Sequence, residues 1–161
     1  MKKRWILTAV LALCCVLTAC GGGKTEPEKD VDLTEFYAAL AADYGWTDES
    51  MMEPDSEMLA MYYPGLEDIS TRQRLARSPL MSYAVNEYVF MQCEDAADAG
   101  TAADILQSRI DSQANGDAWY PETVEQWKNA KVLTNGSYVA LIASGEHQSE
   151  IEAAWNALLA E

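Results

Sequence analysis

Apolar positions in the first part of the folded segment recur with helical spacing. Asp32 is suited to cap a helix and Gly45 to end it, so the pattern predicts a helix over 33–44. The inward face of this helix carries Leu33, Phe36, Tyr37, Leu40 and Tyr44. The segment 55–63 combines helical and alternating spacing, and we interpret it as a short helix that ends before Gly65, with a strand as the alternative.

The centre of the chain is rich in residues that favour strands. Alternating positions over 69–77 predict an exposed strand, and the β-rich run 83–93 predicts a central one. Pro79 separates the two. Thr101 and Asp104 then form a capping-box pattern, which predicts the start of a long helix.

Two further helices and a hairpin are predicted in the last third of the chain. Pro121 is suited to open a short helix. Asn135-Gly136 lies between the β-rich runs 131–134 and 137–144, a pattern that predicts a type I′ hairpin turn. A final helix is expected to begin at about Ser149.

The order of these elements is α, α, β, β, α, α, β, β, α. Hairpins interspersed with helices indicate the α+β class. We therefore predict an antiparallel sheet of about four strands, arranged as two hairpins, with helices packed mainly on one face.

The first twenty residues indicate where the protein works. Lys2, Lys3 and Arg4 precede the apolar run 5–16, which is too short to cross a hydrocarbon core of about 30 Å as a helix. The run Leu17-Thr18-Ala19-Cys20 then reads as a lipobox. An ordinary secretory signal or a buried helix is the competing interpretation.

This segment resembles the signal peptide of a bacterial lipoprotein. The resemblance implies cleavage between Ala19 and Cys20, and a diacylglyceryl group on Cys20 that anchors the protein to the outer face of the cell membrane. We therefore divide the chain into a signal peptide (1–19), a lipidated cysteine with a flexible tether (20–31) and one domain (32–161).

The charge of the chain limits the classes of molecule that it can bind. The formal net charge is −15, and removal of the signal peptide leaves 8 Lys and Arg against 26 Asp and Glu, a net charge of −18. Nucleic acid is disfavoured because binding requires cationic groups that neutralise phosphates. The acidic surface either attracts cations and basic partners or serves only to keep the domain soluble.

Few residues offer recognisable catalytic chemistry. His147 is the only histidine, and Cys93 is the only cysteine after Cys20, which excludes His/Cys zinc sites and Ser-His-Asp or Cys-His triads. We interpret Cys93 as a small buried hydrophobe. A glycine-rich phosphate loop is also missing, so we predict no metal and no cofactor.

Acidic pairs keep one enzymatic alternative open. Asp95 with Asp98, or Asp104 with Asp111, offers an acid and a base for a cell-envelope hydrolase. With 26 acidic residues in the chain, however, such pairs also arise by chance.

Two clusters are candidate binding residues. Arg72, Arg74 and Arg77 form either a site for an anion or an acidic peptide, or charge that protects a sheet edge from pairing. A second set, Trp119, Tyr120 and Trp127, forms either an aromatic platform for a glycan or peptide, or packing between helices and hairpin.

Several short motifs occur in a familiar order. They are Pro79-Leu80-Met81-Ser82, the helix with Arg109 and Asp111, Tyr120-Pro121-Glu122, Lys131-Val132 and Asn135-Gly136-Ser137-Tyr138-Val139. Together with the lipobox they resemble a family of small lipoproteins from Gram-positive bacteria that carry one domain of unknown function. The resemblance covers about Leu33 to Leu159 and implies no catalytic or ligand-binding residues.

We therefore expect a non-enzymatic, lipid-anchored binding module outside the cell. Its partner would be a protein, peptide or glycan at the cell surface. The hydrolase that uses paired carboxylates is the alternative.

Overall fold

The sheet at the centre of the molecule has five strands in the order β1-β2-β3-β5-β4, and every pair of neighbours is antiparallel. The computed structural model describes residues 29–81 and 83–160. The strands are β1 (Met51–Met52), β2 (Thr71–Pro79), β3 (Asn86–Cys93), β4 (Lys131–Asn135) and β5 (Tyr138–Ser144). The two predicted hairpins are therefore confirmed, and β1 adds a short fifth strand beside the end of β2.

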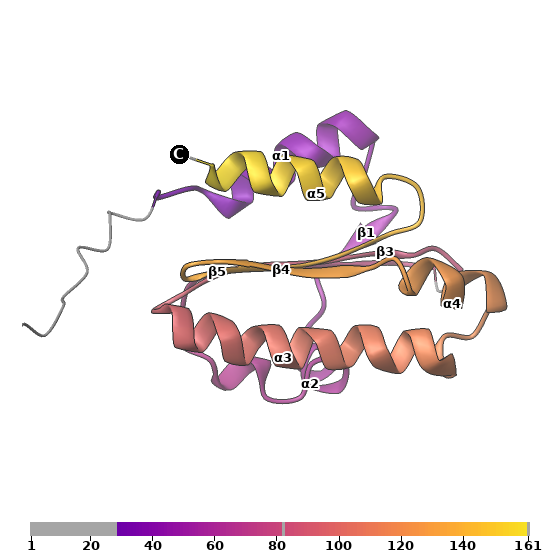
Figure 1. Ribbon diagram of the computed structural model, residues 1–161. Coiled ribbons are helices and arrows are strands. Elements are labelled where there is room, and N and C mark those ends of the chain that lie inside the picture. The colour runs from indigo at the N-terminus through magenta and orange to yellow at the C-terminus, as the bar shows by residue number, and fades with distance from the viewer. Residues whose placement is uncertain (1–28, 82, 161) are drawn as a thin grey trace, which may run out of the picture.

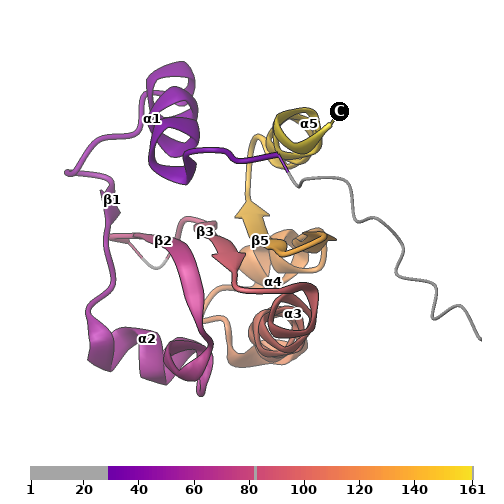
Figure 2. The same ribbon diagram turned by 90° about the vertical axis from the view of Figure 1, so that its left-hand side faces the viewer.

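Helices cover both faces of this sheet. The α-helices are α1 (Leu33–Tyr44), α2 (Ser56–Tyr62), α3 (Ala96–Ser112), α4 (Pro121–Trp127) and α5 (Gln148–Leu159). Figure 1 and Figure 2 show α1 and α5 above the sheet, with α2 and α3 below it. The α+β class is confirmed, but the helices do not lie mainly on one face as predicted.

The two central strands explain the second layer of helices. Every residue of β5 is buried, and only the first residue of β3 is not. Tyr88 and Phe90 join the core under α1 and α5, whereas Val89 and Met91 join the core over α2 and α3. Because successive side chains in a strand point to opposite faces, strands that are apolar throughout need cover on both sides.

Helix boundaries follow the capping residues. The Asp32 carboxylate accepts hydrogen bonds from the backbone of Thr34 and Glu35, so α1 begins and ends where predicted, with Gly45 in the left-handed conformation. The long helix α3 begins at Ala96, not at Thr101, because Asp95 caps it. The Thr101 hydroxyl bonds to the Ala97 carbonyl inside the helix.

Two local details of the last segment also differ from the prediction. Asn135 pairs with Tyr138, so the turn residues are Gly136 and Ser137. Of these two residues, Gly136 has a positive φ of 58° and Ser137 does not. This combination fits a type II′ turn and not a type I′ turn. The final helix, α5, has His147 at its N-cap, and the Ser149 hydroxyl bonds to Glu150 instead of capping the helix.

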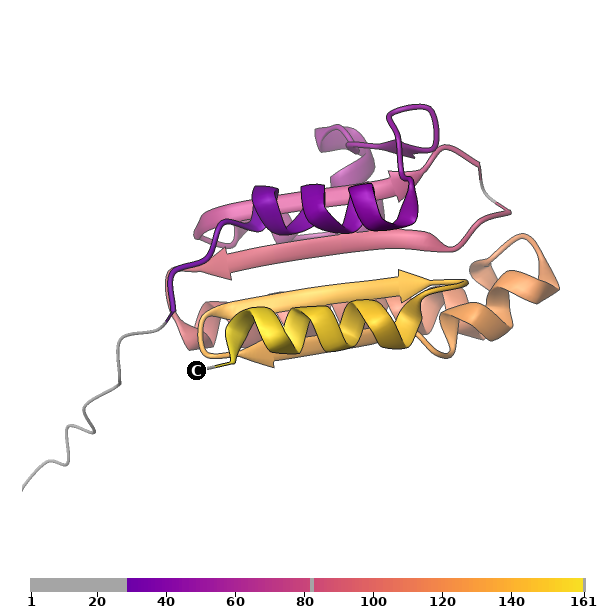
Figure 3. The same cartoon turned by 90° about the horizontal axis from the view of Figure 1, so that it is seen from above.

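The described chain enters the domain at one end of the sheet. Gln73 accepts a hydrogen bond from the backbone of Leu33 and donates one to the carbonyl of Val31. The Tyr138 hydroxyl donates to the carbonyl of Lys29 at 2.9 Å. Figure 3 shows this entry and the C-terminus at one end, and the β2–β3 loop and α4 at the other.

Several residues that predict export and membrane anchoring lie outside the described residues. These are the signal peptide, Ala19, Cys20 and the first part of the tether. Among the residues that are described, no helix combines the length and the hydropathy needed to cross a bilayer.

Candidate functional site

A buried ion pair lies between the sheet and the layer formed by α2 and α3. Glu87 of β3 is 3% exposed and points to this face, as do Val89 and Met91. Arg109 of α3 binds its carboxylate with two hydrogen bonds, from Nε to Oε1 and from Nη2 to Oε2, each 2.9 Å long. The hydroxyl of Tyr63, just after α2, donates to the same Oε1 at 2.5 Å. Three elements that are distant in the sequence therefore meet at one carboxylate.

This arrangement favours the charged form of Arg109 and the neutral form of the Tyr63 phenol. Burial by itself lowers the pKa of Arg109, but the hydrogen bonds and charge of Glu87 outweigh it and raise that pKa. Burial, followed by the charge of Glu87, raises the pKa of Tyr63 well above its ordinary value. Tyr63 therefore serves as a hydrogen-bond donor to the carboxylate.

Aromatic rings hold the arginine in place. The Cζ atom of Arg109 lies 4.2 Å from the centre of the Tyr62 ring and 5.4 Å from that of Trp127. A guanidinium beside aromatic rings gains cation–π attraction, which is stronger where water is excluded. Packing and hydrogen bonding together therefore leave Arg109 little freedom to change rotamer.

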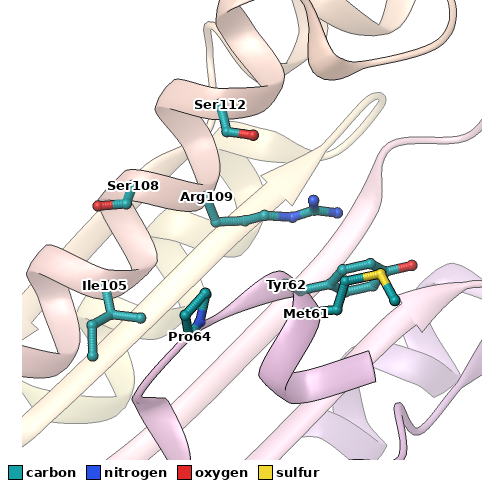
Figure 4. A pocket seen from close by; sticks show the side chains of 7 residues that line it. All are labelled: Met61, Tyr62, Pro64, Ile105, Ser108, Arg109 and Ser112. Atoms are coloured by element: carbon teal, nitrogen blue, oxygen red, sulfur yellow. The ribbon is translucent and has the colours of Figure 1, made fainter. Parts of the chain in front are cut away.

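A pocket of about 380 Å³ opens between α2 and α3, with Arg109 in its wall. Its lining consists of Met61, Tyr62, Pro64, Ile105, Ser108, Arg109 and Ser112. Figure 4 shows the Arg109 guanidinium extending towards Tyr62, and the Ser112 hydroxyl on the same side of α3. The pocket thus combines an apolar lining with a few fixed polar groups, as small-molecule sites do.

A further buried hydroxyl lies next to the ion pair. Because Arg77 pairs with Tyr88, the same register places Ser78 opposite Glu87. Ser78 is 3% exposed, and its Oγ is the one buried side-chain nitrogen or oxygen of the described residues without a hydrogen-bond partner. The polar cluster therefore extends across two strands.

The three arginines of β2 do not converge on one site. Arg72 pairs with Glu94, Arg74 with Glu67 and Arg77 with Glu53. Arg77 also lies 5.1 Å from the centre of the Tyr37 ring, on the α1 face, whereas Arg74 reaches the segment after α2 on the other face. Since β1 pairs only with Ser78 and Pro79, the rest of β2 forms a sheet edge that carries this charge.

The three aromatic residues of the second predicted cluster are also divided. Trp127 is 5% exposed and belongs to the core over α2 and α3. Trp119 is 88% exposed and Tyr120 46%. Only these last two are available at the surface, and Trp127 instead packs beside Arg109.

None of the predicted acidic residues lines the pocket. Asp95 caps α3 and accepts hydrogen bonds from the backbone of Ala97 and Asp98. Asp104 and Asp111 are both exposed on α3, where Asp111 accepts a hydrogen bond from Gln107. Within the ranges 29–81 and 83–160, no group of three His, Cys, Asp or Glu side chains is placed to hold a metal ion.

Cys93 is fully buried, as its interpretation as a small hydrophobe predicts. Burial raises the pKa of its thiol to about 11, and the charges of Asp98 and Asp95 add to the effect. The thiol is therefore protonated at neutral pH and shielded from reagents.

Sequence reasoning missed the role of Glu87. One signal was present, because Glu87 is the only charged residue in the run 83–93. There it occupies the same alternating positions as Val85, Val89 and Met91. A charge at an inward position needs a partner. That partner, Arg109, comes from a helix 22 residues away and could not be identified by spacing.

Comparison with protein families places residues 44–144 in one of them. No curated protein and no solved structure matches the chain. The match runs from the end of α1 to the end of β5, so it includes the ion pair and the whole pocket. The predicted domain of unknown function is confirmed: the chain belongs to the family of the domain of unknown function DUF4358.

Proposed function

We propose that this protein is a lipid-anchored binding module that works outside the cell membrane and takes a small ligand into the α2–α3 pocket. The observation that carries the binding function is a rigid arginine in the wall of a partly apolar pocket. The volume of about 380 Å³ falls within the range of about 300–1,000 Å³ that is usual for small-molecule sites.

The rigidity of Arg109 favours binding over a purely structural role for the pocket. Arg109 is held by two hydrogen bonds to a buried carboxylate and by the Tyr62 ring. A group that is already ordered loses little conformational freedom when a ligand binds to it. An exposed arginine would have to be ordered first.

The proposed anchor is consistent with the position where the described chain enters the domain. Lys29 lies at the end of the sheet opposite the β2–β3 loop and α4. The eight strand residues of β3 correspond to about 25 Å. Nine residues from Cys20 to Lys29 reach at most about 30 Å when fully extended. An anchor at Cys20 would therefore keep the domain close to the bilayer without fixing which end faces it.

Ligand screening with a blocked pocket tests the binding function. We expect a library of small amphipathic compounds to raise the unfolding temperature of the native protein. Substitution Ser108→Trp fills the pocket and should abolish these shifts, whereas Gln107→Trp places the same side chain on the exposed side of α3 and should preserve them. Equal shifts in both variants would contradict the proposal.

Cys20→Ala tests the anchor. In the native host, we expect mass spectrometry to find diacylglycerol on Cys20 of the wild-type chain, and cell fractionation to find that chain with the membrane. The variant should lose the lipid and leave the membrane fraction. An unmodified Cys20 in the wild-type chain would overturn the lipoprotein assignment.

Exposed apolar side chains favour protein recognition as a second function. Several large apolar side chains are exposed in the described residues at the end of the sheet opposite Lys29. They are Leu80, Met81, Tyr83, Trp119 and Tyr120. The hydrogen bond from Gly145 to Val85 and the proximity of Gly145 to Gln126 bring the β2–β3 loop and α4 to this end. Tyr, Trp and Met are enriched in protein interfaces.

The acidic charge of the chain suggests that this partner is a protein with a basic rim around an apolar surface. A photo-crosslinking residue in place of Trp119 should give an adduct with a protein in living cells. The yield of this adduct should fall when the salt concentration is raised. The same residue at Gln107, on the exposed side of α3, should not. Adducts with lipid, or adducts at both positions, would contradict this second function.

A further inference from the structure

We infer that the α2–α3 pocket takes a neutral carboxamide that carries a small apolar group; this inference rests on the proposed binding function. Three properties of the pocket point to that chemical class. They are the hydrogen-bond donors left on Arg109, the acceptor at Ser112 and the cancellation of charge by Glu87.

Arg109 has N–H donors that Glu87 does not use. A guanidinium carries five N–H groups. Two of them bond to Glu87, and the described residues offer no partner to the others. The Tyr62 ring lies over the guanidinium at 4.2 Å, so a ligand must approach another part of the group. A carbonyl oxygen in the pocket would accept a hydrogen bond there.

Ser112 presents the complementary polarity. Its hydroxyl proton is donated to the Asp117 carboxylate at 2.6 Å, which leaves the lone pairs of Oγ to accept. Figure 4 shows this hydroxyl on the same side of α3 as the Arg109 guanidinium. A carboxamide offers both a carbonyl acceptor and an N–H donor, whereas a carboxylate offers no donor.

The charges around the pocket disfavour an anion. Glu87 already neutralises Arg109, and Asp117 places a second carboxylate beside Ser112. An anionic ligand would therefore be repelled by Asp117, and Glu87 would offset its attraction to Arg109. The net charge of −15 adds repulsion at longer range.

The remaining lining accounts for the apolar group. In Figure 4, Ile105 and Pro64 lie towards the backbone end of the Arg109 side chain, and Met61 and the Tyr62 ring lie towards its guanidinium. Burial of apolar area against these side chains supplies the non-directional part of the affinity. The polar groups then fix the orientation of the ligand.

A matched pair of probes tests the inference. 4-Fluorobenzamide and 4-fluorobenzoate have the same ring and almost the same size, and the first is neutral. We expect ¹⁹F NMR titration of the full chain in lipid nanodiscs to give at least tenfold tighter binding for the amide. Its affinity should not change between 0.1 and 1 M NaCl, because no net charge is involved.

Variants identify the binding site. Ser112→Ala removes the acceptor and should weaken amide binding several-fold without changing benzoate binding. Ser108→Trp should abolish binding of both probes, and Gln107→Trp should leave it unchanged, which separates the pocket from the lipid.

The outcomes distinguish the inference from the function on which it rests. If benzoate binds as tightly as the amide, and Ser108→Trp abolishes both, the carboxamide class is wrong but the pocket remains a binding site. If neither probe gives a signal that Ser108→Trp removes, the carboxamide inference is overturned, and the library screen decides whether the pocket binds other ligands.

Discussion

Arginine side chains in this protein contribute unequally to stability because they differ in their exposure to water. The side chains of Arg109 and Glu87 are 14% and 4% exposed, so neither charge can be solvated well if its partner is removed. Arg72 and Glu94 are each about half exposed, and water competes with their attraction. The buried Arg109–Glu87 pair is therefore important for stability, whereas the exposed Arg72–Glu94 pair contributes little.

Substitution of these arginines should separate the two cases. Arg109→Met leaves the Glu87 charge buried and is expected to lower the free energy of unfolding by about 3–5 kcal/mol. Arg72→Met should lower it by less than about 1 kcal/mol. Urea denaturation measures both changes, and equal losses would show that Glu87 is not desolvated in solution.

Addition of Glu87→Gln to the Arg109→Met variant provides the control. A neutral amide removes the unpaired charge, and its carbonyl oxygen can still accept the Tyr63 hydroxyl. The double variant should therefore be more stable than Arg109→Met alone.

Cys93 links stability to alkaline pH. Its thiol has a pKa of about 11 in the folded protein, compared with an ordinary value of 9.0. Between these values the unfolded chain ionises and the folded one does not, so stability is intact below about pH 9 and falls as the pH rises towards 11. This group alone should account for a loss of about 2–3 kcal/mol.

Comparison with Cys93→Ala isolates this effect. Tyr63, whose pKa is also raised, adds to the loss in both proteins. The free energy of unfolding of the wild type should therefore fall more steeply from pH 8 to pH 11 than that of the variant. Parallel curves would mean that the thiol is accessible to water in the folded state.

At the scale of elements, glycines have opposite roles in the β4–β5 hairpin and in α3. Gly136 takes the first turn position with a φ of 58°, where a side chain would be strained. Gly100 lies within α3, and a methyl group there would meet no atom within 4 Å. One glycine is required by the backbone, and the other weakens the helix that carries it.

Two alanine substitutions test this difference. Gly136→Ala should lower the free energy of unfolding by about 1–2 kcal/mol, because alanine disfavours the left-handed conformation. Gly100→Ala should raise it by about 0.5–1 kcal/mol, because alanine favours the helix. Thermal unfolding gives both values, and a stabilising Gly136→Ala would contradict the type II′ turn.

At the scale of the whole molecule, net charge opposes compaction. The formal charge of −15 brings acidic groups closer together when the chain folds. Salt shortens the range of this repulsion, to about 10 Å at 0.1 M and less at higher concentrations. The balance of charge is thus a property that no single residue controls.

Salt should therefore stabilise the protein. We expect the unfolding temperature to rise by a few degrees between 0.05 and 0.5 M NaCl, measured by calorimetry. CaCl₂ at matched ionic strength should produce a similar rise if screening is the cause. A much larger rise with CaCl₂ would identify specific cation binding by the acidic surface instead.

Elements that depend on neighbours along the chain could be predicted from the sequence. Asp32 and Gly45 bound α1 correctly, and the apolar runs around Tyr88 and Leu141 identify the central strands. Caps, turns and periodicity act within a few residues, so spacing records them. Where two local signals competed, as at Asp95 and Thr101, spacing alone chose the wrong cap.

Which distant side chains meet could be learned only from the packed fold. It placed helices on both faces of the sheet, and it buried Trp127, for which the sequence left both an aromatic platform and core packing open. It also brought Glu87, Arg109 and Tyr63 together from β3, α3 and the end of α2. Burial changes the energy of a charge by several kcal/mol, and burial is a property of the packed molecule and not of any segment.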